Sequence, residues 1–432
     1  MLELALGKAL SAQIVRRAEG GGEKAVERGV VGIGEVAPVL PEKGLAVAVN
    51  LKRIDADFWR RTLAGGNGNG AAPELPPLAV DLRAGELVAY GKTLHELRLT
   101  GSQPGPRWRA EVASREMAGR VEWLAEGAGR LSARLSRLTV PDSAKEQIAQ
   151  GEALAELPAL DLATEHLVVR GKDLGEVRLA AENRDGYWNA RLSIQNEDGD
   201  LGGEGRWRPS PTAPETRLDF TLNAKSIERL LGRLGYEEAV RRGTATLSGQ
   251  LSWSGAPFAI DYPTLSGEMK LEARNGQFNK LEPGVGRLLG VLSLQSLPRR
   301  ITLDFRDIFS QGFAFDAIDG TVKAHRGIME TQDLRIQGPA AKVLMAGTTN
   351  LAAETQNLRV LVQPAIGETI ATGVILANPA IGAAAWLFNR MFGTPLDKVF
   401  AYEYSVTGTW ADPKVEKIQA KTEAAAQQEA RP

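Results

Sequence analysis

Apolar and polar side chains alternate with a period of two along most of this chain. Leu218, Phe220 and Leu222, for example, alternate with Asp219 and Thr221. Successive side chains of a strand point to opposite faces, so this pattern predicts half-buried strands. It recurs at residues 131–135, 188–195, 245–253, 265–273, 301–305, 318–324, 358–362 and 402–410. The sequence therefore predicts a mainly β fold built as an antiparallel sheet with one polar and one apolar face.

Turn-forming clusters separate several of these runs. Residues 183–186, 196–200 and 274–276 are rich in Asn, Asp and Gly, as in short antiparallel connections. Helical spacing is rare. We expect one short helix over residues 226–236, capped by Ser226, and a second after Pro283. Two such helices could not cover a long sheet.

An internal repeat with a spacing of 80 residues is visible. Eleven of the 21 residues from 79 to 99 recur in 159–179, and Trp108 recurs as Trp188. Repeated units of this kind bury their apolar faces by stacking on neighbours. We expect a leading segment with a flexible Gly/Pro loop (1–75), two β repeats (76–157 and 158–225), a C-terminal β region (226–363), an apolar helical segment (364–400), a last strand (401–418) and a loose tail (419–432).

Composition argues against several functional classes. The 52 Lys and Arg residues balance 53 Asp and Glu residues, so the main driving force for nucleic-acid binding is missing. The chain has no Cys and only three widely spaced His residues, which argues against a metal site. The carboxylate pairs Asp304 with Asp307 and Glu197 with Asp198 are interpreted as solvated residues of strands or turns. We therefore predict no catalytic residue, no metal and no cofactor.

Two apolar features have more than one interpretation. Trp108, Trp188, Trp253 and Trp410 lie on the apolar faces of their strands, where core packing is the default. Residues 369–389 carry no charge, and Asn378-Pro379 interrupts them. This segment could span a bilayer, contact a membrane surface or form a buried plug. Its candidate membrane- or partner-contacting residues are Val374, Ile375, Leu376, Ile381, Trp386, Leu387 and Phe388.

Several motifs are similar to those of a known family. They include Glu282-Pro283-Gly284-Val285-Gly286-Arg287-Leu288-Leu289-Gly290, Leu303-Asp304-Phe305-Arg306-Asp307, Leu334-Arg335-Ile336-Gln337-Gly338-Pro339 and Tyr402-Glu403-Tyr404-Ser405-Val406. Together with Asp55, Asp57-Phe58-Trp59 and the apolar run at 369–392, they resemble the C-terminal region of the YhdP branch of the AsmA-like family.

The resemblance implies an elongated, twisted sheet curled into a groove, as in bridge-like lipid-transfer proteins. It also implies a periplasmic protein of Gram-negative bacteria that supports the outer-membrane permeability barrier. Such a protein is tethered to the inner membrane by an N-terminal helix, which we expect to be absent from this chain.

The leading hypothesis is a non-enzymatic conduit whose apolar face contacts phospholipid acyl chains. Its predicted lipid-contacting residues are Leu192, Ile194, Phe220, Leu222, Leu271, Leu303, Phe305, Phe315, Val322 and Val360. The alternative is a periplasmic scaffold or outer-membrane assembly factor, with a closed β core and an envelope protein partner at residues 369–392. A hydrolase of envelope polysaccharide is a third and weaker hypothesis, because it would rest on the carboxylates alone.

Overall fold

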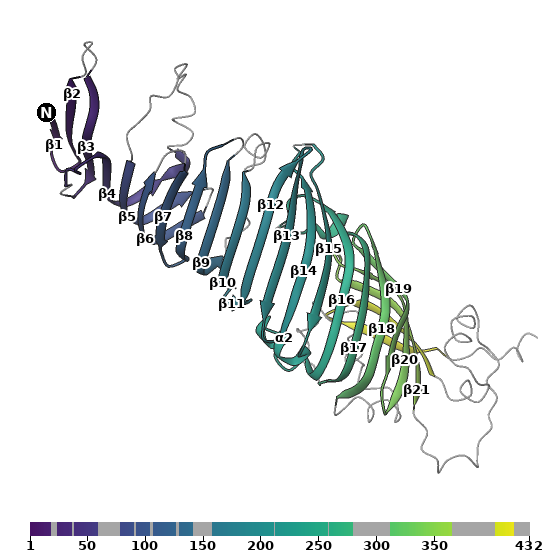
Figure 1. Cartoon of the computed structure of the whole chain (residues 1–432). Coiled ribbons are helices and arrows are strands. Elements are labelled where there is room, and N and C mark those ends of the chain that lie inside the picture. The colour runs from purple at the N-terminus through teal and green to yellow at the C-terminus, as the bar shows by residue number, and fades with distance from the viewer. Residues whose placement is uncertain are drawn as a thin grey trace, which may run out of the picture. The chain divides into compact units, whose positions relative to one another are not determined.

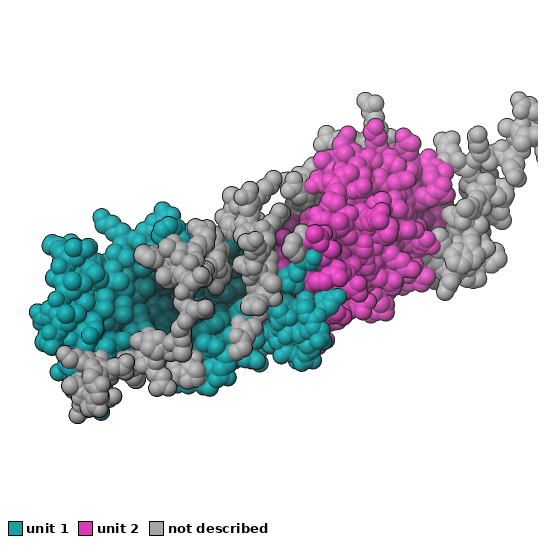
Figure 2. Space-filling model, turned by 90° about the horizontal axis from the view of Figure 1, so that it is seen from above, with its two compact units in different colours: residues 1–196, 209–211 teal, residues 197–208, 212–432 magenta. Residues whose placement is uncertain are grey.

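The computed structural model is dominated by β-strands (Figure 1). It describes residues 1–18, 24–36, 39–58, 78–89, 92–103, 107–126, 129–140, 158–210, 212–257, 259–279, 312–364 and 402–418. The strands of these residues belong to one 23-stranded sheet. Contacts divide the chain into two compact units (Figure 2). Unit 1 comprises residues 1–196 and 209–211, and unit 2 comprises residues 197–208 and 212–432.

Unit 1 contains thirteen strands within the described residues. They are β1 (Leu2–Leu6), β2 (Leu10–Ala18), β3 (Lys24–Gly34), β4 (Gly44–Asp55), β5 (Leu78–Ala89), β6 (Lys92–Gln103), β7 (Arg107–Ala113), β8 (Met117–Leu124), β9 (Arg130–Val140), β10 (Ala159–Val169), β11 (Lys172–Asp173), β12 (Glu176–Arg184) and β13 (Tyr187–Asn196).

Unit 2 adds ten strands, a short α-helix and the 3-10 helix η1 (Tyr262–Thr264) in the part of the chain that is described. The strands are β14 (Gly199–Arg208), β15 (Glu215–Ala224), β16 (Val240–Ser254), β17 (Ser266–Phe278), β18 (Phe313–His325), β19 (Ile328–Gln337), β20 (Ala341–Asn350), β21 (Thr355–Pro364), β22 (Tyr402–Thr409) and β23 (Pro413–Lys417). The helix α2 (Ile227–Arg233) begins after Ser226, whose hydroxyl accepts a hydrogen bond from the backbone N–H of Arg229. This confirms the helix expected over 226–236.

Most neighbouring strands are antiparallel, as the sequence predicts. Three pairs are parallel instead: β3 with β4, β4 with β5, and β9 with β10. The chain segments that join these pairs are much longer than the two-residue turns of the hairpins. Parallel neighbours need such connections because the chain must return to the starting edge of the sheet. The sheet is therefore mixed, and period-two patterning could not reveal this.

The internal repeat corresponds to equivalent places in the sheet. Residues 79–99 form β5 and the first part of β6, while residues 159–179 form β10, β11 and the start of β12. Each copy begins with a strand that pairs in parallel with the strand before it. Each then continues with antiparallel strands. The 80-residue spacing thus marks a repeated structural module.

One predicted turn is wrong. Arg274, Asn275 and Gly276 lie inside β17 rather than between strands. Asn275 has φ 56°, a left-handed conformation that Asn tolerates better than most residues. The pairing of β16 with β17 skips Asn275 and the facing Gly243 together, so the register is the same on either side of them. The Asn-Gly pair therefore lies within a continuous strand and does not end it.

Three expectations lie outside the described residues: the strand at 301–305, the helix after Pro283 and the apolar segment at 364–400. The domain boundaries inferred from the repeat stay predictions. Within the described ranges, no helix has the length and apolarity needed to cross a bilayer.

Candidate functional site

Both units carry one sheet face on which apolar residues lie directly opposite one another from strand to strand. We call this surface the inner face. In unit 2, one row runs through Leu201, Leu222, Leu247 and Leu271 on β14 to β17. A second row runs through Ala224, Ala245, Ala273, Ile318, Ile336, Val343, Val362 and Tyr402 on β15 to β22. Because the rows cross strand after strand, the face is continuous within the unit.

The inner face of unit 2 changes in accessibility along the strand order. Leu222, Leu247 and Leu271 on β15 to β17 are only half-buried. On β19 to β21 the second row is sealed: Ile336, Val343 and Val362 are each 0% exposed. They belong to a core cluster that extends from Val240 to Val415. Part of this face is thus open to a ligand and part is an ordinary core.

Helix α2 lies against the margin of this cluster. Its Ile227 and Leu231 pack on the core, next to Ala245. Figure 1 shows the helix at one end of strands β14 to β16. The small side chains of Ala224, Ala245 and Ala273 leave room there that larger residues would fill. The helix therefore closes one end of the strands.

A buried carboxylate fixes α2 in place. The Asp198 side chain is 3% exposed and forms ion pairs with Arg229 at 2.9 Å and with Arg233 at 2.6 Å. The interpretation of Asp198 as a solvated turn residue is therefore wrong. The turn is correctly predicted, but Arg229 and Arg233, which are distant in the sequence, pair with the Asp198 carboxylate. Glu197, whose side chain is 75% exposed, fits the prediction.

Unit 1 has a longer inner face. One row of opposed residues runs through Leu4, Ala12, Val31, Val47, Val80, Gly101, Ala110, Val121, Ala133, Leu162, Leu179 and Leu192. A neighbouring row ends in Val177 and Ile194. On β1 the leucines are uncovered: Leu2, Leu4 and Leu6 are 56%, 55% and 67% exposed. Figure 2 shows that unit 1 is hollowed on the side seen there.

The predicted lipid-contacting residues fall into three groups. Leu192, Ile194, Phe220, Leu222, Leu271 and Val322 are half-buried. Phe315 and Val360 are each 2% exposed and belong to the core cluster of unit 2. Leu303 and Phe305 lie outside the described residues, as do Val374, Ile375, Leu376, Ile381, Trp386, Leu387 and Phe388. The structure thus aligns the first group on inner faces, and lipid contact stays a prediction.

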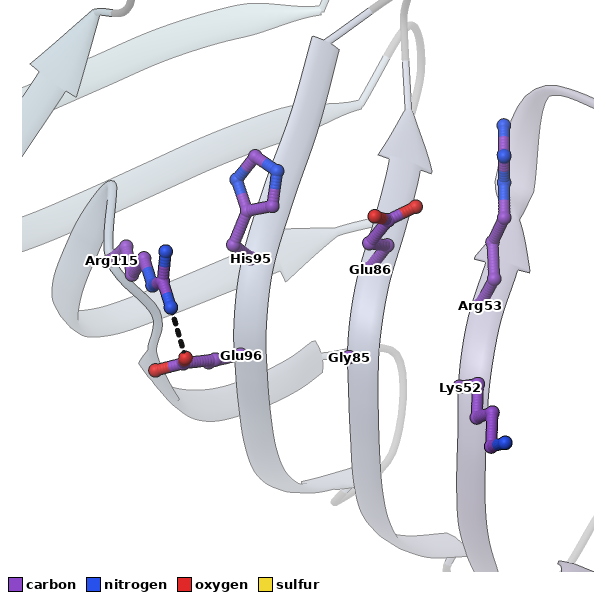
Figure 3. A pocket seen from close by; sticks show the side chains of 7 residues that line it. All are labelled: Lys52, Arg53, Gly85, Glu86, His95, Glu96 and Arg115. Atoms are coloured by element: carbon purple, nitrogen blue, oxygen red, sulfur yellow. Dashed lines mark hydrogen bonds and ion pairs between the residues drawn. The ribbon is translucent and has the colours of Figure 1, made fainter.

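A charged pocket of about 440 Å³ lies on unit 1 (Figure 3). Its lining residues are Lys52, Arg53, Gly85, Glu86, His95, Glu96 and Arg115. Gly85 and Glu96 directly adjoin Ala84 and Leu97, which are buried in an apolar cluster. Adjacent strand residues point to opposite faces, so the pocket opens on the polar side of the sheet.

The pocket contains local ion pairs rather than an organised reaction centre. Arg115 pairs with Glu96, which lowers the pKa of that carboxyl below its ordinary value. Beside the pocket, the Glu116 carboxylate accepts hydrogen bonds from the His95 backbone N–H at 2.8 Å and from its ring at 2.7 Å. Among the described residues, no group of three or more His, Cys, Asp or Glu residues could hold a metal ion. Nothing in this pocket points to a reaction.

Sequence reasoning missed two features of the site. Asp198 forms ion pairs with Arg229 and Arg233, which lie about 30 residues away in the sequence. We call these ion pairs the Asp198 latch, and no local sequence pattern predicts them. The second feature is the division of the inner face into open and sealed parts, because half-buried Leu271 and sealed Ile336 lie in strands with the same alternation. Residues predicted to contact a ligand and residues that pack a core have the same side chains.

A model of the YhdP protein family matches residues 1–415. The chain therefore belongs to the YhdP family. A curated relative, the intermembrane phospholipid transporter YhdP of Escherichia coli strain K12, is 30% identical over 220 residues. That match covers 50% of this chain but only 17% of the relative, whose printed name describes a transporter rather than an enzyme. No solved structure matches this chain.

Proposed function

We propose that this chain forms part of a non-enzymatic phospholipid conduit in the Gram-negative envelope. In this proposal, acyl chains lie on the half-buried inner faces of the two units, and phospholipid moves between the inner and outer membranes. The observation that carries the proposal is the register of apolar rows, which continue from β1 to β13 in unit 1. The name of the E. coli relative supports the same cargo.

The apolar rows address the main barrier to lipid transfer. Exposing a sixteen-carbon acyl chain to water would cost about 13 kcal/mol, at roughly 0.8 kcal/mol per methylene. A continuous apolar surface removes most of this cost. Hydrophobic contact is also non-directional, so a lipid can move from one row of side chains to the next without breaking a specific bond. The conduit supplies no energy, and the direction of transport is set elsewhere.

The proposal places the chain in the periplasm, where it supports the permeability barrier of the outer membrane. Residues 369–392 would contact a membrane or an envelope protein there. Lipid is expected to use Leu192, Ile194, Phe220, Leu222, Leu271 and Val322 rather than Phe315 and Val360. The last two are already covered in the core cluster.

A second candidate function is a periplasmic scaffold with a closed β core. The observation that favours it is the sealed part of unit 2, where Ile336, Val343 and Val362 have no exposed surface. In that case the inner face would contribute stability alone. Deletion of residues 369–392 would then remove a protein partner from an envelope pull-down and would leave lipid content unaffected.

Native mass spectrometry of the chain purified from cells separates the two functions. A conduit should carry co-purified phospholipid that denaturation releases. A matched variant with Leu192→Asp should carry much less lipid, while Arg191→Asp, on the opposite face of β13, should carry the normal amount. A lipid-free mass for the unmodified chain would contradict the conduit.

A further inference from the structure

The tryptophans of the described residues share one margin of the inner face in each unit. In unit 1, Trp108 and Trp188 are the second residues of β7 and β13, and Trp123 is the last but one of β8. β8 is antiparallel to β7 and β9. Its end therefore lies beside the start of β7. The start of β13 lies on the same side, because β13 runs in the direction of β9 through β10 and β12. We call this edge the tryptophan margin.

Unit 2 has the same arrangement. Trp207 and Trp253 are the last but one residues of β14 and β16, which run in the same direction through β15. Trp410 directly follows β22. Trp207 and Trp253 flank Thr216 in one cross-strand row. Each unit thus carries its own tryptophan margin.

The rings of Trp108 and Trp123 pack against glycines and remain partly exposed to solvent. The two residues lie directly opposite each other, and both are half-buried. A Cβ atom on Gly101 would come within 2.9 Å of the Trp108 ring, and one on Gly129 within 2.3 Å of the Trp123 ring. Both indoles therefore lie over glycines. Within the described residues, neither ring N–H has a hydrogen-bond partner, so both donors are available.

The described phenylalanines other than Phe220 have the opposite distribution. Phe58 follows the end of β4, away from the tryptophan margin of unit 1. In unit 2, Phe278 ends β17, while Phe313 and Phe315 lie at the start of β18. Indole combines an apolar body with a polar N–H, whereas the phenyl ring is wholly apolar. The aromatic residues of the two margins therefore differ in polarity, as those of the interfacial and central zones of a bilayer do.

The dimensions of the inner face suit a lipid lying across it. The apolar side chains from Trp123 to Met117 span six residues of β8, or roughly 20 Å at about 3.3 Å per residue. One leaflet of a bilayer core is about 15 Å thick, half of the roughly 30 Å total. The acyl chains of one phospholipid thus fit between the two margins of unit 1.

We propose that phospholipid lies along the strands of unit 1, with its glycerol and headgroup at the tryptophan margin and its chain ends toward the opposite margin. Trp108 and Trp123 mark the polar–apolar boundary, and their ring N–H groups donate to ester or phosphate oxygens of the lipid. This inference rests on the proposed function and adds the orientation of the cargo.

Depth-dependent quenching of tryptophan emission tests this orientation. The full chain is equilibrated with phosphatidylcholine that carries a nitroxide on the headgroup, near the ester end of the acyl chain, or near the terminal methyl. The emission of Trp108 and Trp123 is obtained by subtracting the tryptophan emission of the W108F/W123F variant from that of the unmodified chain. We expect the headgroup and ester-end labels to quench this emission about twofold more than the methyl-end label.

Three further variants complete the test. If W108F/W123F loses its strand signal in circular dichroism, the single variants W108F and W123F replace it. Met117→Trp adds an indole at the end of β8 opposite Trp123, and its added emission should be quenched most by the methyl-end label.

Strongest quenching of Trp108 and Trp123 by the methyl-end label, or equal quenching by all three labels, would overturn the orientation and leave the conduit standing. Absence of quenching by every label would overturn both.

Discussion

Leu247 of β16 lies directly opposite Leu271 of β17, and Leu222 of β15 lies directly opposite Leu247 on its other side. This register keeps the apolar row continuous across three strands. A slip of one residue would place Thr246 or Ser248 in the row and turn every leucine to the polar face. The apolar face therefore depends on register as much as on composition.

The same charge should have different effects in the open and sealed parts of the inner face. Val343→Asp buries an unpaired carboxylate at a position with no exposed surface, and we expect a loss of about 3–5 kcal/mol in the free energy of unfolding. Leu192 is half-buried, so Leu192→Asp should cost about 1 kcal/mol and leave a folded chain. Thermal unfolding followed by circular dichroism measures both. Equal destabilisation would contradict the distinction between the two parts.

The Asp198 latch should control the stability of α2. Asp198→Asn removes the charge that holds Arg229 and Arg233, and we expect about 2–3 kcal/mol less protection of the α2 amides in hydrogen exchange. The matched control is Glu197→Gln, because Glu197 is mostly exposed and its pairing with Arg233 should contribute less than about 0.5 kcal/mol. Unchanged exchange of α2 in Asp198→Asn would show that apolar packing alone holds the helix.

Acid should weaken the contact between β6 and the turn before β8. Burial by itself would raise the pKa of Glu116, but hydrogen bonds from His95 and from its own backbone N–H lower that pKa below its ordinary value of 4.5. A carboxyl with a depressed pKa in the folded state stabilises the fold above the unfolded pKa and loses this effect as pH falls through the folded value. Stability should therefore decline as pH falls below about 4.5.

Glu116→Gln provides the comparison for this decline. The variant should be less stable than the unmodified chain at pH 7, because the amide cannot replace a charged acceptor. The gap between the two unfolding curves should narrow as the pH falls below 4.5. A gap that stays constant over this range would show that Glu116 does not titrate in the folded state as described.

Gly119 allows the bulge that bends β8 against β9. Its φ is 144°, and a Cβ there would approach the backbone oxygen of Arg134 to 2.3 Å. Gly119→Ala should therefore destabilise unit 1 by about 1–3 kcal/mol. Gly202→Ala is the control, because a Cβ at Gly202 would meet no atom within 4 Å and should change stability by less than about 1 kcal/mol. Thermal unfolding of both variants measures the difference, and equal midpoints would contradict the close approach.

Local patterns predict the strands because each face of a strand is formed by alternate residues of one short stretch of sequence. The alternation of Leu218, Phe220 and Leu222 with Asp219 and Thr221 specified β15, and Ser226 specified the start of α2. The parallel pairing of β9 with β10 could not be predicted in this way. This pairing depends on where the end of β9 at Val140 and the start of β10 at Ala159 lie in space, and the neighbouring residues in the sequence do not determine that.

The candidate site was predicted in part for the same reason. Leu192 and Ile194 were assigned to an apolar face, and the register places both on the inner face of unit 1. Phe315 and Val360 were assigned to the same kind of surface, yet they lie in the core cluster of unit 2. Alternation indicates which side of a strand is apolar. It does not indicate whether protein or ligand covers that side.

Site-specific photo-crosslinking on β13 shows whether lipid lies on the inner face of unit 1. A photoreactive amino acid at Leu192 would lie on the inner face, whereas the same group at Arg191 would lie on the opposite face one residue away. After irradiation in cells, the account predicts phospholipid adducts at position 192 and none above background at position 191. Adducts at neither position, or equally at both, would contradict the claim that this face carries lipid.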